Sequence, residues 1–409
     1  MAMRPLERFR QFVKAHREHP VLSVYVGGGL ADVAEQHSWQ VPLRHALRRA
    51  WAAAQEAPLA GVAEGDAAAF AACEVEVLAA LPEPRAIHDA GAWCAFAAVP
   101  APGDVVLFSA VLPRAVPTQV RWQAGALVLP YLAAAPEGPA LVLQLERDQG
   151  RLLRLEGDHL TELARDAVEL ELGAAAHMGD TPRQGFHTGT RGETLTDLAQ
   201  RRLREARQQL LSGLLARTVA ALEPSGVLVV GGAEEVGRHA LTLLPEGVTA
   251  RATWAAGLRA PLADAPLARV ARRAADGVRD AQHLRWLEGI REGAHAAGHG
   301  ATGPAVVRQA LALGAVERLL LSTALTQRDP AGAEAMARDA LLQGATVVVS
   351  PNSAGEQLER LARGAAARLR YALPAVGVPL SGFTPRAGAS APPVPPSSTP
   401  PLPLAGGPA

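Results

Sequence analysis

The chain has 409 residues, of which 49% are hydrophobic and 20% are charged, and this composition is typical of folded domains. Lys and Arg number 40, as do Asp and Glu, so the formal net charge is zero. This balance excludes a uniformly basic nucleic-acid coat, although it leaves room for local basic patches. The length predicts two to four domains.

Cysteine usage and hydropathy favour a reducing, aqueous compartment. Cys73 and Cys94 are the only cysteines, too few for a four-cysteine zinc site. The N-terminus carries charges throughout, unlike a signal peptide, and no apolar stretch reaches the roughly 18–20 residues of a membrane span. We therefore expect a cytoplasmic protein without membrane contact. His295 and His299 lie four residues apart, but no metalloprotease signature surrounds them, so we expect neither a metal nor another cofactor.

Residues 1–135 are predicted to form an N-terminal α/β domain. Helical spacing of apolar residues predicts helices over Pro5–His19, Gln40–Ala57 and Ala67–Leu81. The β-rich run Val21–Val26 predicts a strand. Two further strands, in 86–100 and 104–113, are expected to pair around a turn at Pro102-Gly103.

Residues 136–264 are predicted to form a middle α/β domain. Strands in 140–147 and 150–158 flank a turn at 148–150, which is a hairpin signal. Residues 162–172 are expected to be extended or mixed, and a long glycine-rich loop, Gly173–Gly192, follows. A long helix over Glu193–Leu222 and a buried strand over Val227–Gly232 complete this domain.

Residues 265–373 are predicted to form a C-terminal α/β/α sandwich. Its expected elements, in chain order, are a helix over Ala265–Ala297, a helix ended by Gly314, a strand over Val316–Ser322, a helix over Ala333–Gln343, a strand over Ala345–Ser350, a helix over Ser353–Gly364 and a strand over Ala365–Leu373. Residues 374–409 are rich in proline and have one charged side chain, Arg386, so we expect a disordered tail with polyproline character.

The loop Gly173–Gly192 and the helix after it concentrate basic residues. Six arginines against three acidic residues between Arg183 and Arg207 give about three net positive charges. Arginine suits phosphate, while glutamine and backbone amides supply hydrogen bonds, so the segment is a candidate RNA-binding site. An ordinary solvated loop and helix face is the alternative. The candidate residues are His177, Arg183, Gln184, Gly185, His187, Arg191, Arg201, Arg202, Arg204 and Arg207.

The order of these segments resembles the bacterial branch of the archaeo-eukaryotic peptide-chain release factor superfamily, whose relatives include the ribosome-rescue factor Pelota and the hibernation factor Balon. The matching stretches are VLSVYV, LFSAVLPRAVP, LVLQLERDQGRLLRLEGD, the long loop and helix, VLVVGGAEEVGRHALTLLPEGV, GATGPAVVRQALALGAVERLLLS and GATVVVS. Together they cover nearly everything from Leu6 to Leu373.

The resemblance implies three domains: an N-terminal one on the decoding-centre side, a ribonuclease-H-like middle domain and a C-terminal domain similar to kink-turn-binding ribosomal proteins. In hydrolytic members the middle loop carries Gly-Gly-Gln, whose glutamine helps to position the water that attacks peptidyl-tRNA. Here Pro182 and Arg183 precede Gln184. Proline stiffens the backbone where glycine would give freedom, which argues against hydrolysis.

The sequence therefore predicts a monomeric translation factor that binds the ribosomal A site in hibernation or rescue without hydrolysing peptidyl-tRNA. Its expected partners are ribosomal RNA, tRNA and a translational GTPase such as elongation factor Tu. Two alternatives stay open. One is a release or rescue factor that hydrolyses peptidyl-tRNA with Gln184. The other is an RNA- or protein-binding module that does not act on the ribosome.

Overall fold

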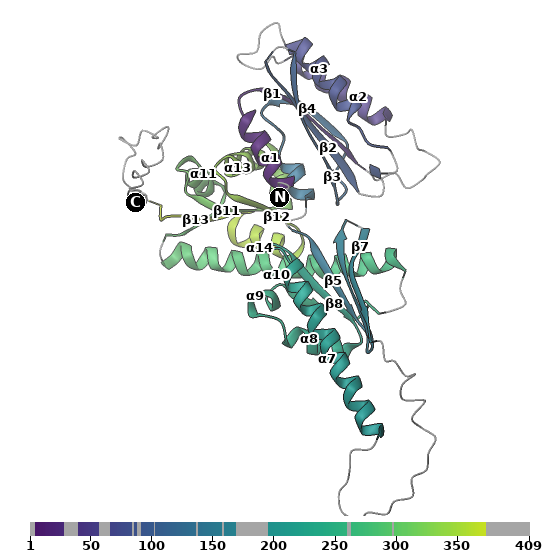
Figure 1. Ribbon diagram of the computed structural model, residues 1–409. Coiled ribbons are helices and arrows are strands. Elements are labelled where there is room, and N and C mark those ends of the chain that lie inside the picture. Colours follow the sequence, from purple (N-terminus) through teal and green to yellow (C-terminus); the bar gives the residue numbers. More distant parts are fainter. Residues whose placement is uncertain are drawn as a thin grey trace, which may run out of the picture. The chain divides into compact units, whose positions relative to one another are not determined.

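The computed structural model describes residues 5–27, 40–56, 66–83, 86–87, 91–101, 103–135, 138–157, 159–168, 195–259, 263–296 and 298–373. Residues 1–372 form one compact unit. Its described part contains three β-sheets with helices packed on them, so the expected mixed α/β class is confirmed (Figure 1). The proline-rich tail predicted after residue 373 lies outside the described residues.

The first sheet has the strand order β3-β2-β1-β4, and each neighbouring pair is antiparallel. The predicted pairing of the two strands that flank Pro102-Gly103 is confirmed, and Ala101 pairs with Asp104. Pro102 of the predicted turn lies outside the described residues. The strand β4 is absent from the sequence-based prediction. The elements of this part are α1 (Pro5–Ala15), β1 (Pro20–Gly27), α2 (Gln40–Glu56), α3 (Asp66–Ala79), β2 (Ala92–Ala101), β3 (Asp104–Leu112), β4 (Gln119–Ala124) and α5 (Leu129–Ala134).

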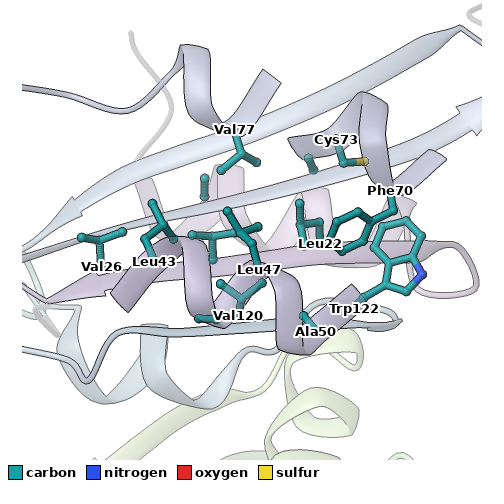
Figure 2. Close-up of a cluster of buried hydrophobic side chains, with 14 of the residues drawn as sticks. Leu22, Val26, Leu43, Leu47, Ala50, Phe70, Cys73, Val77, Val120 and Trp122 are labelled. Carbon is teal, nitrogen blue, oxygen red and sulfur yellow. The ribbon is translucent and has the colours of Figure 1, made fainter. Parts of the chain in front are cut away.

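Helices cover both faces of the first sheet, which is why β1 is buried along its length. On one face, α2 and α3 pack through Leu47 and Phe70 against Leu22 and other strand residues (Figure 2). On the other face, Phe9 of α1 packs on Phe96 of β2, and their ring centroids are 4.9 Å apart. The continuous apolar run of β1 reflects this two-sided burial.

The second sheet has the order β7-β6-β5-β8-β9, with an antiparallel meander β5-β6-β7 and parallel pairs β5–β8 and β8–β9. The predicted hairpin is thus confirmed, and the edge strand β7 overlaps the first part of the segment 162–172 expected to be extended or mixed. The elements of this part are β5 (Ala140–Leu145), β6 (Gln149–Glu156), β7 (His159–Ala167), α7 (Leu195–Ala221), β8 (Val227–Gly232), α8 (Glu234–Thr242), α9 (Glu246–Thr249) and β9 (Ala252–Trp254).

The third sheet has the order β10-β13-β11-β12, in which β11 and β12 are parallel and β13 is antiparallel to both of its neighbours. Gly314 and Gly344 adopt positive φ angles of 68° and 75° just after helices, as the predicted helix ends require. The elements of this part are α10 (Asp264–Ala296), β10 (Gly300–Thr302), α11 (Pro304–Ala312), β11 (Val316–Ser322), α12 (Thr323–Arg328), α13 (Pro330–Leu342), β12 (Thr346–Ser350), α14 (Asn352–Ala362) and β13 (Ala365–Leu369).

Helix α10 contributes to two hydrophobic cores. Its first half places Leu267 and Ala271 in the core under the second sheet, beside Val142 of β5. Its second half places Leu287 and Ile290 in the core of the third sheet. The two halves of this helix therefore belong to different cores. The domain boundary predicted from the sequence, at 264/265, lies at the start of the helix. The helix ends at Ala296, so His295 and His299 do not share a helix face.

A buried carboxylate connects the first sheet region to the third. Glu334 of α13 accepts hydrogen bonds from the backbone N–H groups of Val128 and Leu129, at 2.7 and 2.9 Å, where α5 begins. Arg338, one turn further along α13, donates to the carbonyl oxygen of Ala124 at 2.9 Å. Burial outweighs these donors and raises the pKa of the Glu334 carboxyl above its ordinary value of 4.5.

This raised pKa predicts a pH-dependent contribution to stability. The folded state holds the Glu334 proton more tightly than the unfolded chain, so the contribution favours folding at low pH and is lost as pH rises through the raised pKa. Glu334→Gln removes this loss. We expect the melting temperature of the Gln variant, relative to the unaltered protein, to increase between about pH 4.5 and pH 7.5. Thermal unfolding scans measure this difference in melting temperature. If it stays constant or decreases over that pH range, the raised pKa of Glu334 is contradicted.

Candidate functional site

Helix α7 carries the four sequence-predicted arginines that the structure describes. Its second half is anchored to the second sheet, where Leu211 and Leu214 pack against Leu141 of β5. The guanidinium of Arg217 also pairs with the carboxylate of Asp166 on β7. Towards its N-terminus the helix extends past the sheet (Figure 1), and most of its side chains between residues 200 and 209 are exposed.

The exposed arginines are distributed around α7. With 100° between successive residues, Arg202 and Arg204 point to opposite sides of the helix. Both are exposed, and neither has an ion-pair partner among the residues that the structure describes. The Nε atom of Arg201 lies 3.7 Å from Oε1 of Glu205, one turn away, and both side chains are more than half exposed. A pair of this kind stabilises a helix by only about 0.3–0.5 kcal/mol and leaves the charge accessible.

Arg207 differs from the other three. Its Nε atom donates to Oδ1 of Asp148 at 2.7 Å, and its side chain is 32% exposed. Asp148 lies in the turn between β5 and β6, so this pair holds α7 against the hairpin. The sequence predicts Arg207 as electrostatic support for RNA binding, on the solvent side of the helix or near it. In the structure its half-buried guanidinium has an ion-pair partner within the protein.

The loop half of the predicted site lies outside the described residues. It comprises His177, Arg183, Gln184, Gly185, His187 and Arg191. The structure therefore places Arg201, Arg202, Arg204 and Arg207 on one helix and leaves the grouping of the loop residues with them as a prediction. Charged side chains on several sides of a helix suit contact with phosphates that surround it.

The described residues offer little chemistry for covalent or metal catalysis. Burial raises the pKa of the Cys73 thiol to about 12 and that of Cys94 higher still, so neither forms the nucleophilic thiolate at neutral pH. In the described part of the chain, no three His, Cys, Asp or Glu side chains are grouped so as to hold a metal ion. What the described site offers is cationic hydrogen-bond donors.

Comparison with known proteins gave similarity to solved structures only. No family model matches the chain, and no curated protein matches it. An archaeal translation termination factor, aRF1, is 16% identical over 91% of this chain and 99% of its own, with a TM-score of 0.24. Dom34 from S. cerevisiae, a translation termination-like factor, is 10% identical over 69% of this chain and 81% of its own, with a TM-score of 0.41. Pelota from Archaeoglobus fulgidus is 15% identical over 68% and 79% of the two chains, with a TM-score of 0.33.

At these TM-scores the similarity carries no argument about function, which has to be argued from this chain's own residues.

The hydropathy of the helices was also compared with that of membrane spans. None of the helices in the described ranges combines the length and the apolar character needed to cross a bilayer.

The different environments of the α7 arginines predict different effects of substitution. Arg202→Gln with Arg204→Gln should lower affinity for ribosomes roughly tenfold or more and weaken its salt dependence, because two accessible cations are lost. Arg207→Gln should affect affinity less, and should lower the free energy of unfolding by up to about 1 kcal/mol through the lost Asp148 pair. Ribosome sedimentation across a salt series and thermal unfolding measure the two effects.

Arg217→Gln is the matched control, because Arg217 is on the same helix but pairs with Asp166 on the sheet. We expect it to leave ribosome affinity unchanged. If Arg207→Gln or this control lowers affinity more than the double variant does, the exposed end of α7 is not the binding surface.

Proposed function

We propose that this protein is a ribosome-associated translation factor of the release-factor and Pelota type, which binds the ribosomal A site in hibernation or rescue. The observation that carries the proposal is the exposed, arginine-bearing end of α7, located directly after the glycine-rich loop Gly173–Gly192. A basic loop and helix that extend from a rigid sheet can reach into a cavity walled by RNA phosphates. The order of segments along the chain, described above as a resemblance, supports the same proposal.

The proposed domains extend over 1–135, 136–264 and 265–373, with the N-terminal domain towards the decoding centre. The strand order β7-β6-β5-β8-β9, an antiparallel meander followed by two parallel strands, supports a ribonuclease-H-like middle domain. In the third sheet, α10 and α14 share a core on one face, and Figure 1 shows α11 and α13 on the opposite face. This layering supports an α/β/α sandwich similar to kink-turn-binding ribosomal proteins. Helix α10, which begins at the proposed 264/265 boundary, contributes residues to the cores of both the second and the third sheet.

The proposed mode of action is occupancy without hydrolysis. Arg183, Gln184, Gly185, His187 and Arg191 would contact ribosomal RNA or the tRNA acceptor end, with His177 nearby and the α7 arginines as support. A hydrolytic glutamine has to come within about 2.6–3.2 Å of the attacking water or the ester. Pro182 and Arg183 stand where hydrolytic relatives have two glycines, and they restrict that approach.

The partners in this proposal are the ribosome, through its RNA, and a bound tRNA. A translational GTPase such as elongation factor Tu would deliver the protein, which acts as a cytoplasmic monomer. The alternative function is peptide release or rescue by hydrolysis, with Gln184 orienting the water, and the presence of this glutamine favours that alternative.

Single-turnover peptide release separates the proposal from its alternative. We expect no release from ribosome-bound peptidyl-tRNA above the rate in buffer. Gln184→Ala should leave ribosome affinity within roughly tenfold, because one hydrogen bond contributes about 0.5–1.5 kcal/mol. Deletion of Gly179–Gly189 should lower affinity much more, because the whole loop tip is lost.

Two outcomes would contradict the proposal. Fast release that Gln184→Ala abolishes would establish the hydrolytic alternative. A protein that does not sediment with ribosomes at low salt would instead be a binding module that acts elsewhere.

A further inference from the structure

A second basic surface lies on α2, outside the segment that the sequence singled out. The rotation of α2 is fixed by its apolar residues, since Leu43, Leu47 and Ala50 are buried in the core under the first sheet (Figure 2). Arg44, Arg48 and Arg49 therefore lie on the opposite, solvent side, together with His45, and all four are exposed. We call Arg44, Arg48 and Arg49 the α2 arginine cluster.

The charge of the α2 arginine cluster is not compensated within the described structure. The sequence has no acidic residue between Glu35 and Glu56. No described carboxylate forms an ion pair with any arginine of the cluster, whereas other surface arginines, such as Arg165 and Arg238, pair with nearby glutamates. Three like charges on adjacent turns repel one another, so an anion that bridges them would remove an existing electrostatic cost.

The surroundings of the α2 arginine cluster favour a nucleic acid over a protein partner. The other exposed residues described on this helix are Val41, Pro42, Ala52, Ala53 and Gln55. None of them is aromatic, and most have short side chains. Protein interfaces have cores enriched in aromatic residues and depleted of charge, whereas interfaces with nucleic acids are positively charged and polar. Short side chains also leave room for a polyanion to approach the arginines closely.

We propose that the α2 arginine cluster binds the phosphate backbone of double-helical RNA without reading its sequence. Arg44 and Arg48 lie one turn apart, about 6 Å along the helix axis, on one flank of the exposed face, and Arg49 lies on its other flank, about 100° around the helix from Arg48. Guanidinium groups can each form two hydrogen bonds to one phosphate. The choice of RNA over DNA rests on the function proposed above. The α2 contact itself is a separate surface on the first sheet region, independent of α7 and the loop before it.

The direct test uses a fluorescein-labelled RNA duplex of 20 base pairs and the full-length protein. Arg44→Gln, Arg48→Gln and Arg49→Gln combined should lower duplex affinity at least tenfold near physiological salt, and should reduce the slope of log affinity against log salt by about three. The matched control combines Arg269→Gln, Arg291→Gln and Arg360→Gln, which removes the same charge from exposed positions on α10 and α14. We expect the control to bind the duplex as the unaltered protein does. The triple Lys variant of the cluster should retain most of the slope, because it keeps the charge.

An equal loss in the control, or unchanged binding by the cluster variant with an unaltered melting temperature, would overturn the inference. So would complete competition by polyglutamate at matched charge, because the cluster would then be an acidic-protein site. If the triple Gln variant does not fold, the triple Lys variant provides the test. A Lys variant that folds but loses the salt dependence of duplex binding also overturns the inference. Ribosome sedimentation distinguishes the two proposals. Failure of the unaltered protein to sediment with ribosomes contradicts the proposed function, whereas an unaltered protein that sediments but does not bind the duplex contradicts only the α2 contact.

Discussion

The packing of α10 against two sheets is the constraint on which much of the structure depends. A single helix of 33 residues supplies Leu267 and Ala271 to the core under the second sheet and Leu287 and Ile290 to the core of the third. Because a helix is stiff over this length, neither core can be fully packed without ordering the segment that serves the other. The opposite face of the second sheet holds the anchored half of α7. The exposed arginines of α7 are thus displayed from a sheet that is packed on both faces.

Buried polar contacts add a second connection between parts of the chain that are distant in sequence. Glu334 reaches Val128 and Leu129, which precede it by about two hundred residues, and satisfies two backbone donors that would otherwise be buried without partners. Burial makes this carboxylate costly to ionise, which raises its pKa. Taken with α10, this contact explains why residues 1–372 form one compact unit.

Local patterns predicted most of the regular elements. The hairpin of β5 and β6, the strand β1 and the helix ends at Gly314 and Gly344 depend on residues close together in sequence, so their signals are legible. Seven short elements of the described structure were missed, namely β4, α5, α8, α9, β9, β10 and α12. The strand β4 alternates polar and apolar residues, so a signal for it was present in the sequence. The pairing of Arg207 with Asp148 joins residues far apart in the chain, which no local pattern encodes. The α2 arginine cluster was overlooked because its exposure depends on which face of α2 is buried against the first sheet.

The basic surfaces on α7 and α2 support the proposal that this protein binds RNA at more than one place. A cryo-electron-microscopy map of the protein with ribosomes tests this account most directly. The account predicts density in the A site, with the N-terminal end of α7 directed towards the tRNA acceptor end and with α2 against an RNA helix. Density outside the A site, or an A-site particle in which both α7 and α2 face solvent, would contradict it.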